Sequence, residues 1–229
     1  MERKIFHSLC KSTSTKYDLQ EPMYLKSLES EKLQVFFTGS PSSGKTTFLN
    51  ALLGLSRNEL YESTKKATKC IFKISYGTIP KYRREFGVDE DLPENINARR
   101  ELLHYFNLHD NSVTLYFPLD LLLHIDIYDT PGLFSGDSTD DLFNEIVCTS
   151  DLIVLCKNLE DMLTPEESKL IDACKKSGSN YLVLLTFEDL FETSKRNDAQ
   201  FYIEFLETKK SEFGSPVLIQ TVSSEDYFR

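Results

Sequence analysis

The chain has 229 residues, of which 40% are hydrophobic and 27% are charged, and its formal net charge at pH 7 is −10. This length predicts one large domain with a substantial core, and the composition is that of an ordinary globular protein. The negative charge argues against nucleic acid as a partner, and against an anionic membrane as the default one.

The cysteines and the N-terminal residues predict a cytoplasmic protein. The first residues lack the apolar run of a secretory signal, and no apolar run is long enough to span a membrane. The cysteines show no C-x-x-C spacing, which favours reduced thiols over a disulfide framework or a zinc site. They are Cys10, Cys70, Cys148, Cys156 and Cys174.

The first part of the chain predicts a polar extension followed by a strand, a turn and a helix. Residues 1–32 are weakly patterned, and we expect them to be partly helical. Residues 33–229 are expected to form one domain. Its first elements are a strand at 33–37 and a helix at 47–53 that stops at Gly54.

The next segment changes from an alternating pattern to a charged one. Alternation of apolar and polar side chains predicts a half-buried strand at 68–76. Residues 78–111 are expected to be an irregular insertion over one edge of the core, with a helical patch at 97–106. Two further strands are predicted at 113–117 and 121–128.

The second half of the chain alternates capped helices with apolar strands. A capping box at Thr164 and Glu167 marks the start of one helix, which stops at Gly178. The pattern indicates an α/β fold, a doubly wound and mostly parallel sheet with helices on both faces. Ligands of such sheets bind at the carboxyl ends of the strands. The predicted helices are 138–148, 165–177 and 198–213, and the strands are 152–156, 181–187 and 216–222.

The turn between the first strand and helix matches G-x-x-x-x-G-K-[ST]. Gly39 and Gly44 allow a backbone turn that brings N–H groups against phosphate oxygens. Lys45 supplies a charge for the β- and γ-phosphates, and the Thr46 hydroxyl a ligand for Mg²⁺. A plain serine–glycine turn would not need Lys-Thr there, so we predict a nucleotide phosphate site. Its candidate residues are Gly39, Ser40, Pro41, Ser42, Ser43, Gly44, Lys45, Thr46 and Thr47.

A second candidate element, D-T-P-G, follows the strand predicted at 121–128. The Asp129 carboxylate can hold the Mg²⁺ shell through water, and the Gly132 N–H can contact a γ-phosphate. Turn chemistry alone also permits this sequence. Its place after the phosphate-binding loop favours the nucleotide role.

The ends of the last two predicted strands carry candidate base-reading residues. After Thr186, the Asp189 carboxylate could accept hydrogen bonds from N1–H and N2–H₂ of guanine, a donor pair that adenine lacks. Guanine-binding proteins usually have Lys where this chain has Phe187, whose ring could cover the base or simply fill the core. At the last strand, a backbone N–H of Ser223 or Ser224 could meet the guanine O6.

A threonine between the loop helix and the second strand could complete the Mg²⁺ shell and orient the attacking water. Thr64 and Thr68 are both candidates, and Thr68, directly before the strand, is preferred. Strand propensity explains a threonine there equally simply.

The order of these motifs resembles that of a translation-factor-class GTPase. Within that class the chain most resembles the dynamin superfamily, especially its mitofusin-like and bacterial dynamin-like branch. Residues 39–54, 67–77 and 113–132 carry this resemblance, which extends over about 33–224. It implies a G domain of the P-loop NTPase fold that binds GTP or GDP with Mg²⁺ and hydrolyses GTP to GDP and phosphate.

The resemblance also implies how hydrolysis would proceed. Dynamin-like GTPases need no external arginine finger and dimerise across the nucleotide face, so a homodimer is expected. The catalytic residues would be Ser42, Lys45 and Thr68, and the metal-binding residues Thr46, Thr68 and Asp129. Members remodel or fuse membranes, so a peripheral membrane location, through a partner or another segment, is part of the expectation.

Three departures from the family pattern leave alternatives open. Pro41 stands where classical dynamins have a polar side chain, and Phe187 replaces the usual lysine. The chain ends soon after its last predicted strand, so it is either a G-domain fragment or a stand-alone G domain. A nucleotide-binding pseudo-GTPase that serves as an interaction module is one alternative. An ATP-using P-loop enzyme is another, disfavoured by Asp129 and Asp189.

Overall fold

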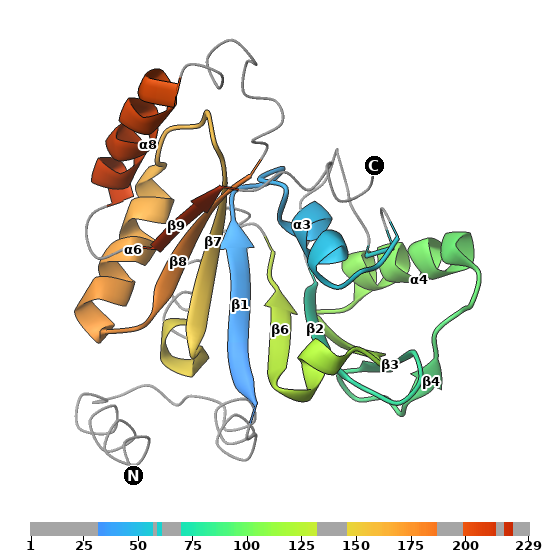
Figure 1. Ribbon diagram of the computed structural model, residues 1–229. Coiled ribbons are helices and arrows are strands. Elements are labelled where there is room, and N and C mark those ends of the chain that lie inside the picture. The colour runs from blue at the N-terminus through green and yellow to red at the C-terminus, as the bar shows by residue number, and fades with distance from the viewer. Residues whose placement is uncertain are drawn as a thin grey trace, which may run out of the picture. The chain divides into compact units, whose positions relative to one another are not determined.

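The computed structural model describes residues 32–56, 59–60, 70–131, 146–186, 199–213 and 218–221. The predicted extension, except its last residue, and most of the helix predicted at 138–148 lie outside this part. In chain order (Figure 1) the elements are β1 (Leu33–Gly39), α3 (Lys45–Leu52), β2 (Ile71–Tyr76), β3 (Lys81–Arg84), β4 (Glu90–Asp91), α4 (Ile96–His109), β5 (Ser112–Phe117), the 3₁₀ turn η1 (Asp120–Leu123), β6 (Ile125–Asp129), β7 (Leu152–Asn158), α6 (Pro165–Ser177), β8 (Tyr181–Thr186), α8 (Ala199–Phe213) and β9 (Leu218–Thr221).

The strands form one sheet, which in the described part of the chain has nine strands in the order β4-β3-β5-β2-β6-β1-β7-β8-β9. Strand β1 pairs in parallel with β6 on one side and β7 on the other, and β8 and β9 continue the parallel half. On the other side β2 runs antiparallel to β6 and parallel to β5, and β3 and β4 complete the edge. The predicted mostly parallel α/β sheet is confirmed.

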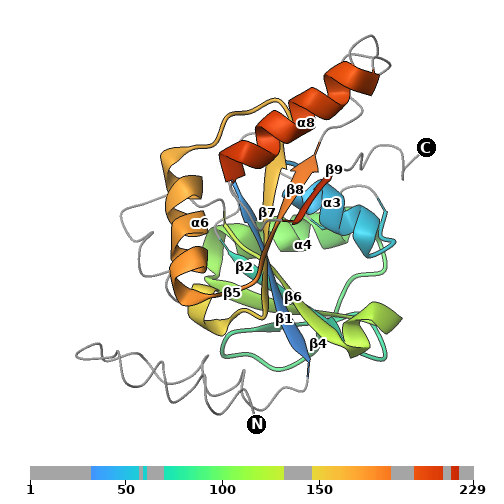
Figure 2. The same cartoon turned by 60° about the vertical axis from the view of Figure 1, so that its left-hand side comes forward.

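Helices cover both faces of this sheet, as Figures 1 and 2 show. Because successive side chains of a strand point to opposite faces, neighbouring residues of β1 belong to different cores. Phe37 packs in the core that α3 and α4 share, and Phe36 in the core that α6 and α8 share. With both faces covered, β1 is buried along almost its whole length, as a central parallel strand should be.

The helix predicted after Thr164 forms as expected. The Thr164 hydroxyl accepts a hydrogen bond from the Glu167 N–H, and the Glu167 side chain accepts from the Thr164 N–H, so both halves of the capping box are present. Pro165 begins α6, and Gly178 ends it with a left-handed φ of 72°. The capping box and Pro165 therefore define where α6 begins.

Two sequence-based predictions were wrong in detail. The strand predicted at 121–128 starts only at Ile125, because residues 120–123 form η1, whose Leu122 packs in the core. The segment 81–111 is more regular than predicted, because β3 pairs with β5 and β4 with β3. Charged side chains point away from the core at such an edge, which hid the strand pattern.

A polar cluster lies on the sheet face opposite α4. Asp126 of β6 is buried and accepts hydrogen bonds from Lys73 at 2.8 Å and from the Ser75 hydroxyl at 2.7 Å. Burial alone would raise the pKa of Asp126, but the hydrogen bond and charge of Lys73 lower it below the ordinary value. This ion pair joins β2 to β6.

The described helices were also considered as membrane spans. Among the residues that the structure describes, none belongs to a helix long and apolar enough to cross a bilayer.

Candidate nucleotide-binding site

The predicted phosphate-binding loop links the end of β1 to the start of α3. Gly39, Ser42 and Gly44 have positive φ values of 149°, 62° and 76°. Gly44 caps α3 without any side-chain hydrogen bond to the first-turn N–H groups. Those N–H groups keep their capacity to bind an anion, and the helix dipole favours negative charge at the same point. The backbone is thus shaped for a phosphate group.

Gly39 is required by its neighbour as well as by its φ. The register of β1 and β7 places Gly39 beside Cys156. A Cβ on Gly39 would lie 2.1 Å from the Cys156 carbonyl oxygen, a distance that no side chain can occupy. The phosphate-binding loop can therefore begin this close to the backbone of β7 only if residue 39 is glycine.

Lys45, Thr46 and Asp129 converge at the carboxyl ends of β1 and β6. The Lys45 ammonium lies 2.7 Å from one carboxylate oxygen of Asp129, and the Thr46 hydroxyl donates to the other at 3.1 Å. The side chains of Lys45 and Asp129 are both buried. Buried charges of this kind need a partner. Asp129 is more than eighty positions away from Thr46 in the sequence, and the structure brings the two side chains together.

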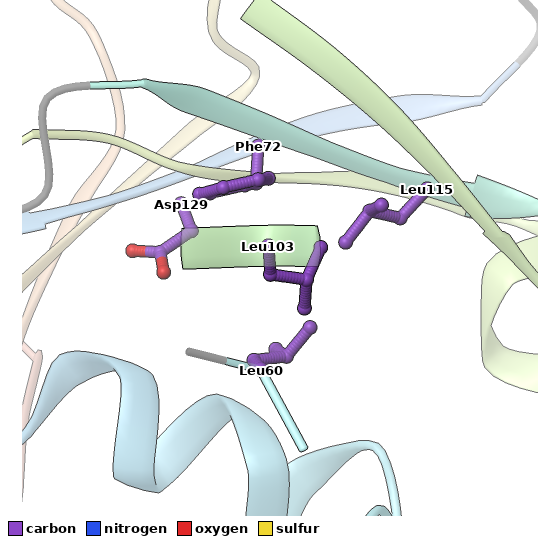
Figure 3. A pocket seen from close by; sticks show the side chains of 5 residues that line it. All are labelled: Leu60, Phe72, Leu103, Leu115 and Asp129. Atoms are coloured by element: carbon purple, nitrogen blue, oxygen red, sulfur yellow. The ribbon is translucent and has the colours of Figure 1, made fainter. Parts of the chain in front are cut away.

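Asp129 also borders a small cavity, shown in Figure 3. The other side chains around it are apolar and come from β2, β5, α4 and the segment after α3: Phe72, Leu115, Leu103 and Leu60. Apolar walls on this side lower the local dielectric, which strengthens the attraction between Asp129 and the cation beside it.

The donor set fits Mg²⁺. Mg²⁺ prefers hard oxygen ligands and is usually bound by one or two protein groups together with phosphates and water. The Thr46 hydroxyl and the Asp129 carboxylate are such groups, at the start of a helix that can hold the phosphates. In the described residues no group of three or more His, Cys, Asp or Glu could hold a metal. The Thr46 hydroxyl and the Asp129 carboxylate would fill only part of a Mg²⁺ shell, and phosphate oxygens and water would complete it.

Thr186, which precedes the candidate base-reading Asp189 in the sequence, lies at the end of β8 and contacts the phosphate-binding loop. Its hydroxyl lies 2.6 Å from the carbonyl oxygen of Ser43 and 3.1 Å from that of Lys157. It therefore joins the end of β8 to the phosphate-binding loop and to β7. Similarly, the Thr130 hydroxyl donates to the Phe37 carbonyl oxygen at 2.9 Å, which ties the D-T-P-G turn to β1.

Several predicted site residues lie outside the described residues. They stay predictions from the sequence, as does the choice between the two threonines. They are Thr64, Thr68, Gly132, Phe187, Asp189, Ser223 and Ser224.

Sequence reasoning missed two residues beside the loop. The Ser40 hydroxyl donates to Glu167 of α6 at 2.8 Å, and Lys157 of β7 lies 2.8 Å from the other oxygen of that carboxylate. Glu167 was expected only as a helix cap. Nothing in the sequence signals its contact with the loop, because that contact depends on how α6 packs against the sheet.

Comparison with known proteins was made at the level of family and of structure. The model of the dynamin family matches residues 35–187. A search of curated proteins found no match. Two similar solved structures are described as an oligomerised bacterial dynamin pair that provides a mechanism for long-range sensing and tethering of membranes. One has a TM-score of 0.63 and 18% identity, and the match covers 99% of this chain and 38% of that structure's chain. The other has a TM-score of 0.59 and 16% identity, and the match covers 98% of this chain and 43% of that structure's chain.

These identities show a shared fold, and this chain spans less than half of either structure. The sheet order, the loop before α3 and the Lys45–Asp129 pair together define a P-loop G domain. The match of the family model covers most of the chain, which therefore belongs to the dynamin family. The mitofusin-like branch stays a prediction from the sequence.

Proposed function

We propose that this chain binds GTP and GDP with Mg²⁺ and hydrolyses GTP to GDP and phosphate. The observation that carries the proposal is the convergence of Lys45, Thr46 and Asp129 at the foot of an uncapped helix. Membership of the dynamin family supports the choice of GTP. Bound Mg²⁺ would neutralise charge on the β- and γ-phosphates.

The chain's own residues would divide the work. When a nucleotide enters, the Lys45 ammonium exchanges Asp129 for phosphate oxygens, where it stabilises charge that develops during cleavage. Asp129 and the Thr46 hydroxyl are then available as oxygen ligands. Ser42, exposed at the tip of the loop, would contact the phosphates, and Thr68 would hold the attacking water.

We expect this hydrolysis to depend on pairing of two copies across the nucleotide face. GTP turnover per molecule should then rise with protein concentration, because dimer formation organises Ser42 and Thr68. The measurement is phosphate release at saturating GTP and Mg²⁺ over a wide range of protein concentrations. A low rate that does not change with concentration, together with retained binding, would contradict this and support the pseudo-GTPase alternative. Pro41 and Phe187 are the residues that motivate that alternative.

The same assay can address a membrane role. The two similar structures come from proteins whose descriptions mention membranes, and we propose that this chain reaches a membrane through a partner or another segment. Turnover and sedimentation with lipid vesicles should therefore equal those without them. Direct co-sedimentation of the chain in any nucleotide state would contradict this.

Base selectivity is the second test of the proposal. Asp189→Asn should shift the preference from guanine toward xanthine, because an amide can donate to the xanthine oxygen where the carboxylate accepts from guanine. Competition of GTP, XTP and ATP for the wild-type and variant sites measures this. Preference of the wild type for ATP would support the ATP-using alternative. Unchanged selectivity in the variant would move base reading to another residue.

A further inference from the structure

Glu167 is the most enclosed carboxylate near the phosphate-binding loop. Glu167 is fully buried, and its ion-pair partner Lys157 is only 2% exposed. One oxygen accepts hydrogen bonds from the Lys157 ammonium at 2.8 Å and from the Thr164 N–H at 2.9 Å. The other accepts from the Ser40 hydroxyl at 2.8 Å. A single side chain thus joins a strand end, a helix start and the loop.

A helix cap alone does not explain this arrangement. A capping box needs only the two reciprocal hydrogen bonds between the N-cap residue and the residue three positions later. A buried ion pair carries a desolvation penalty that its mutual attraction often only balances. Lys157 and Thr164 both donate to one oxygen of the Glu167 carboxylate, and the other oxygen accepts from Ser40. Beyond the hydrogen bonds of an ordinary capping box, Glu167 also contacts the phosphate-binding loop through Ser40.

The contact lies within a set of attachments that fix the loop from the side of β7. Gly39 pairs with Cys156 of β7. The Ser40 hydroxyl donates to Glu167, and the Ser43 carbonyl oxygen accepts from Thr186. Lys157 joins the last two, because its ammonium contacts Glu167 and its carbonyl oxygen lies 3.1 Å from the Thr186 hydroxyl. These contacts preorganise the backbone N–H groups of the loop for phosphate binding.

We propose that Glu167 is a positioning residue for nucleotide binding, which acts by holding Ser40 and couples the phosphate-binding loop to the first turn of α6. This inference rests on the proposed nucleotide function. Preorganisation of a loop raises affinity because less ordering is left to occur on binding. Coupling between two sites is reciprocal, so bound nucleotide should also stabilise the first turn of α6.

The test variant is Ser40→Ala, which removes one hydrogen bond and leaves the Lys157–Glu167 pair and the capping box intact. Its matched control is Ser168→Ala. The Ser168 hydroxyl donates to the Thr164 carbonyl oxygen at 3.0 Å in the same helical turn and has no contact with the loop. Both variants lose one partly buried serine hydrogen bond, so their stabilities should fall alike.

The first measurement is the affinity of each full-length variant for GDP that carries a methylanthraniloyl fluorophore on its ribose. Loss of one positioning hydrogen bond should weaken binding by Ser40→Ala roughly three- to tenfold, and that of Ser168→Ala should stay as in wild type. Equal affinity in the two variants would overturn the positioning role. A wild-type chain that binds no nucleotide would overturn both this inference and the proposed function.

The second measurement is amide hydrogen exchange of the first turn of α6 with and without GDP. In wild type, GDP should slow exchange at Glu167 and Ser168, and in Ser40→Ala this slowing should be lost even at saturating GDP. A purely structural role for Glu167 would leave the nucleotide-dependent difference the same in both proteins. That result would contradict the coupling.

Discussion

Lys45→Ala should reduce nucleotide affinity by about thirtyfold to several thousandfold. Truncating one member of a buried, hydrogen-bonded charge pair costs about 2–5 kcal/mol, and each 1.4 kcal/mol is a factor of ten. Lys45 is buried and forms its ion pair with Asp129 in the absence of nucleotide, so its ammonium is already directed toward the site. Without it, both the phosphates and Asp129 lack their cation. Equilibrium titration with fluorescent GDP measures the loss.

The control for this variant is Lys73→Ala. Lys73 also forms an ion pair with a buried aspartate of β6, at 2.8 Å from Asp126, but on the opposite face of the sheet. We expect its removal to lower the free energy of unfolding and to leave GDP affinity unchanged. Wild-type affinity in Lys45→Ala would mean that the loop does not bind phosphates. An equal loss of affinity in both variants would mean that Lys45 acts only through stability.

The parts of the site that the sequence predicted are those set by local structure. A glycine-rich turn between a buried strand and a helix fixes the positions of Lys45 and Thr46 within one segment. The convergence with Asp129 was also predictable, because the carboxyl ends of parallel strands meet at one edge of a sheet. The apolar run of β7 and the capping box of α6 likewise predicted their elements within a residue or two.

The parts that could not be predicted depend on packing between distant elements. Glu167 contacts Ser40 across 127 positions, and only the seating of α6 on the sheet brings them together. The Thr186 hydroxyl meets the Ser43 carbonyl oxygen across 143 positions, a contact that the sequence did not indicate. The 3₁₀ turn η1 escaped prediction because Leu121, Leu122 and Leu123 have the composition of a buried strand, although two of them are partly exposed.

Gly39→Ala should be the most destabilising single methyl addition in the described part of the loop. The new Cβ would lie 2.1 Å from the Cys156 carbonyl oxygen, and β1 and β7 are paired there. Neither group is a flexible side-chain end, so the strands or the loop must shift. Overpacking costs about 1–3 kcal/mol and an unfavourable φ of 149° a similar amount. The sum is a large share of the 5–15 kcal/mol by which proteins are typically stable.

Gly178→Ala is the control, because it adds a methyl group at a positive φ without a steric clash. Gly178 also has a positive φ, 72°, but a Cβ there would meet nothing within 4 Å. It should therefore show the conformational cost alone, about 1 kcal/mol. Urea unfolding of both variants gives the difference, which combines the clash with Cys156 and the higher conformational cost of φ 149°. Equal losses would mean that β7 yields easily at this point. A much larger loss of unfolding free energy in Gly39→Ala, only partly restored by saturating GDP, would show that the Cys156 carbonyl group sets how closely the loop approaches β7.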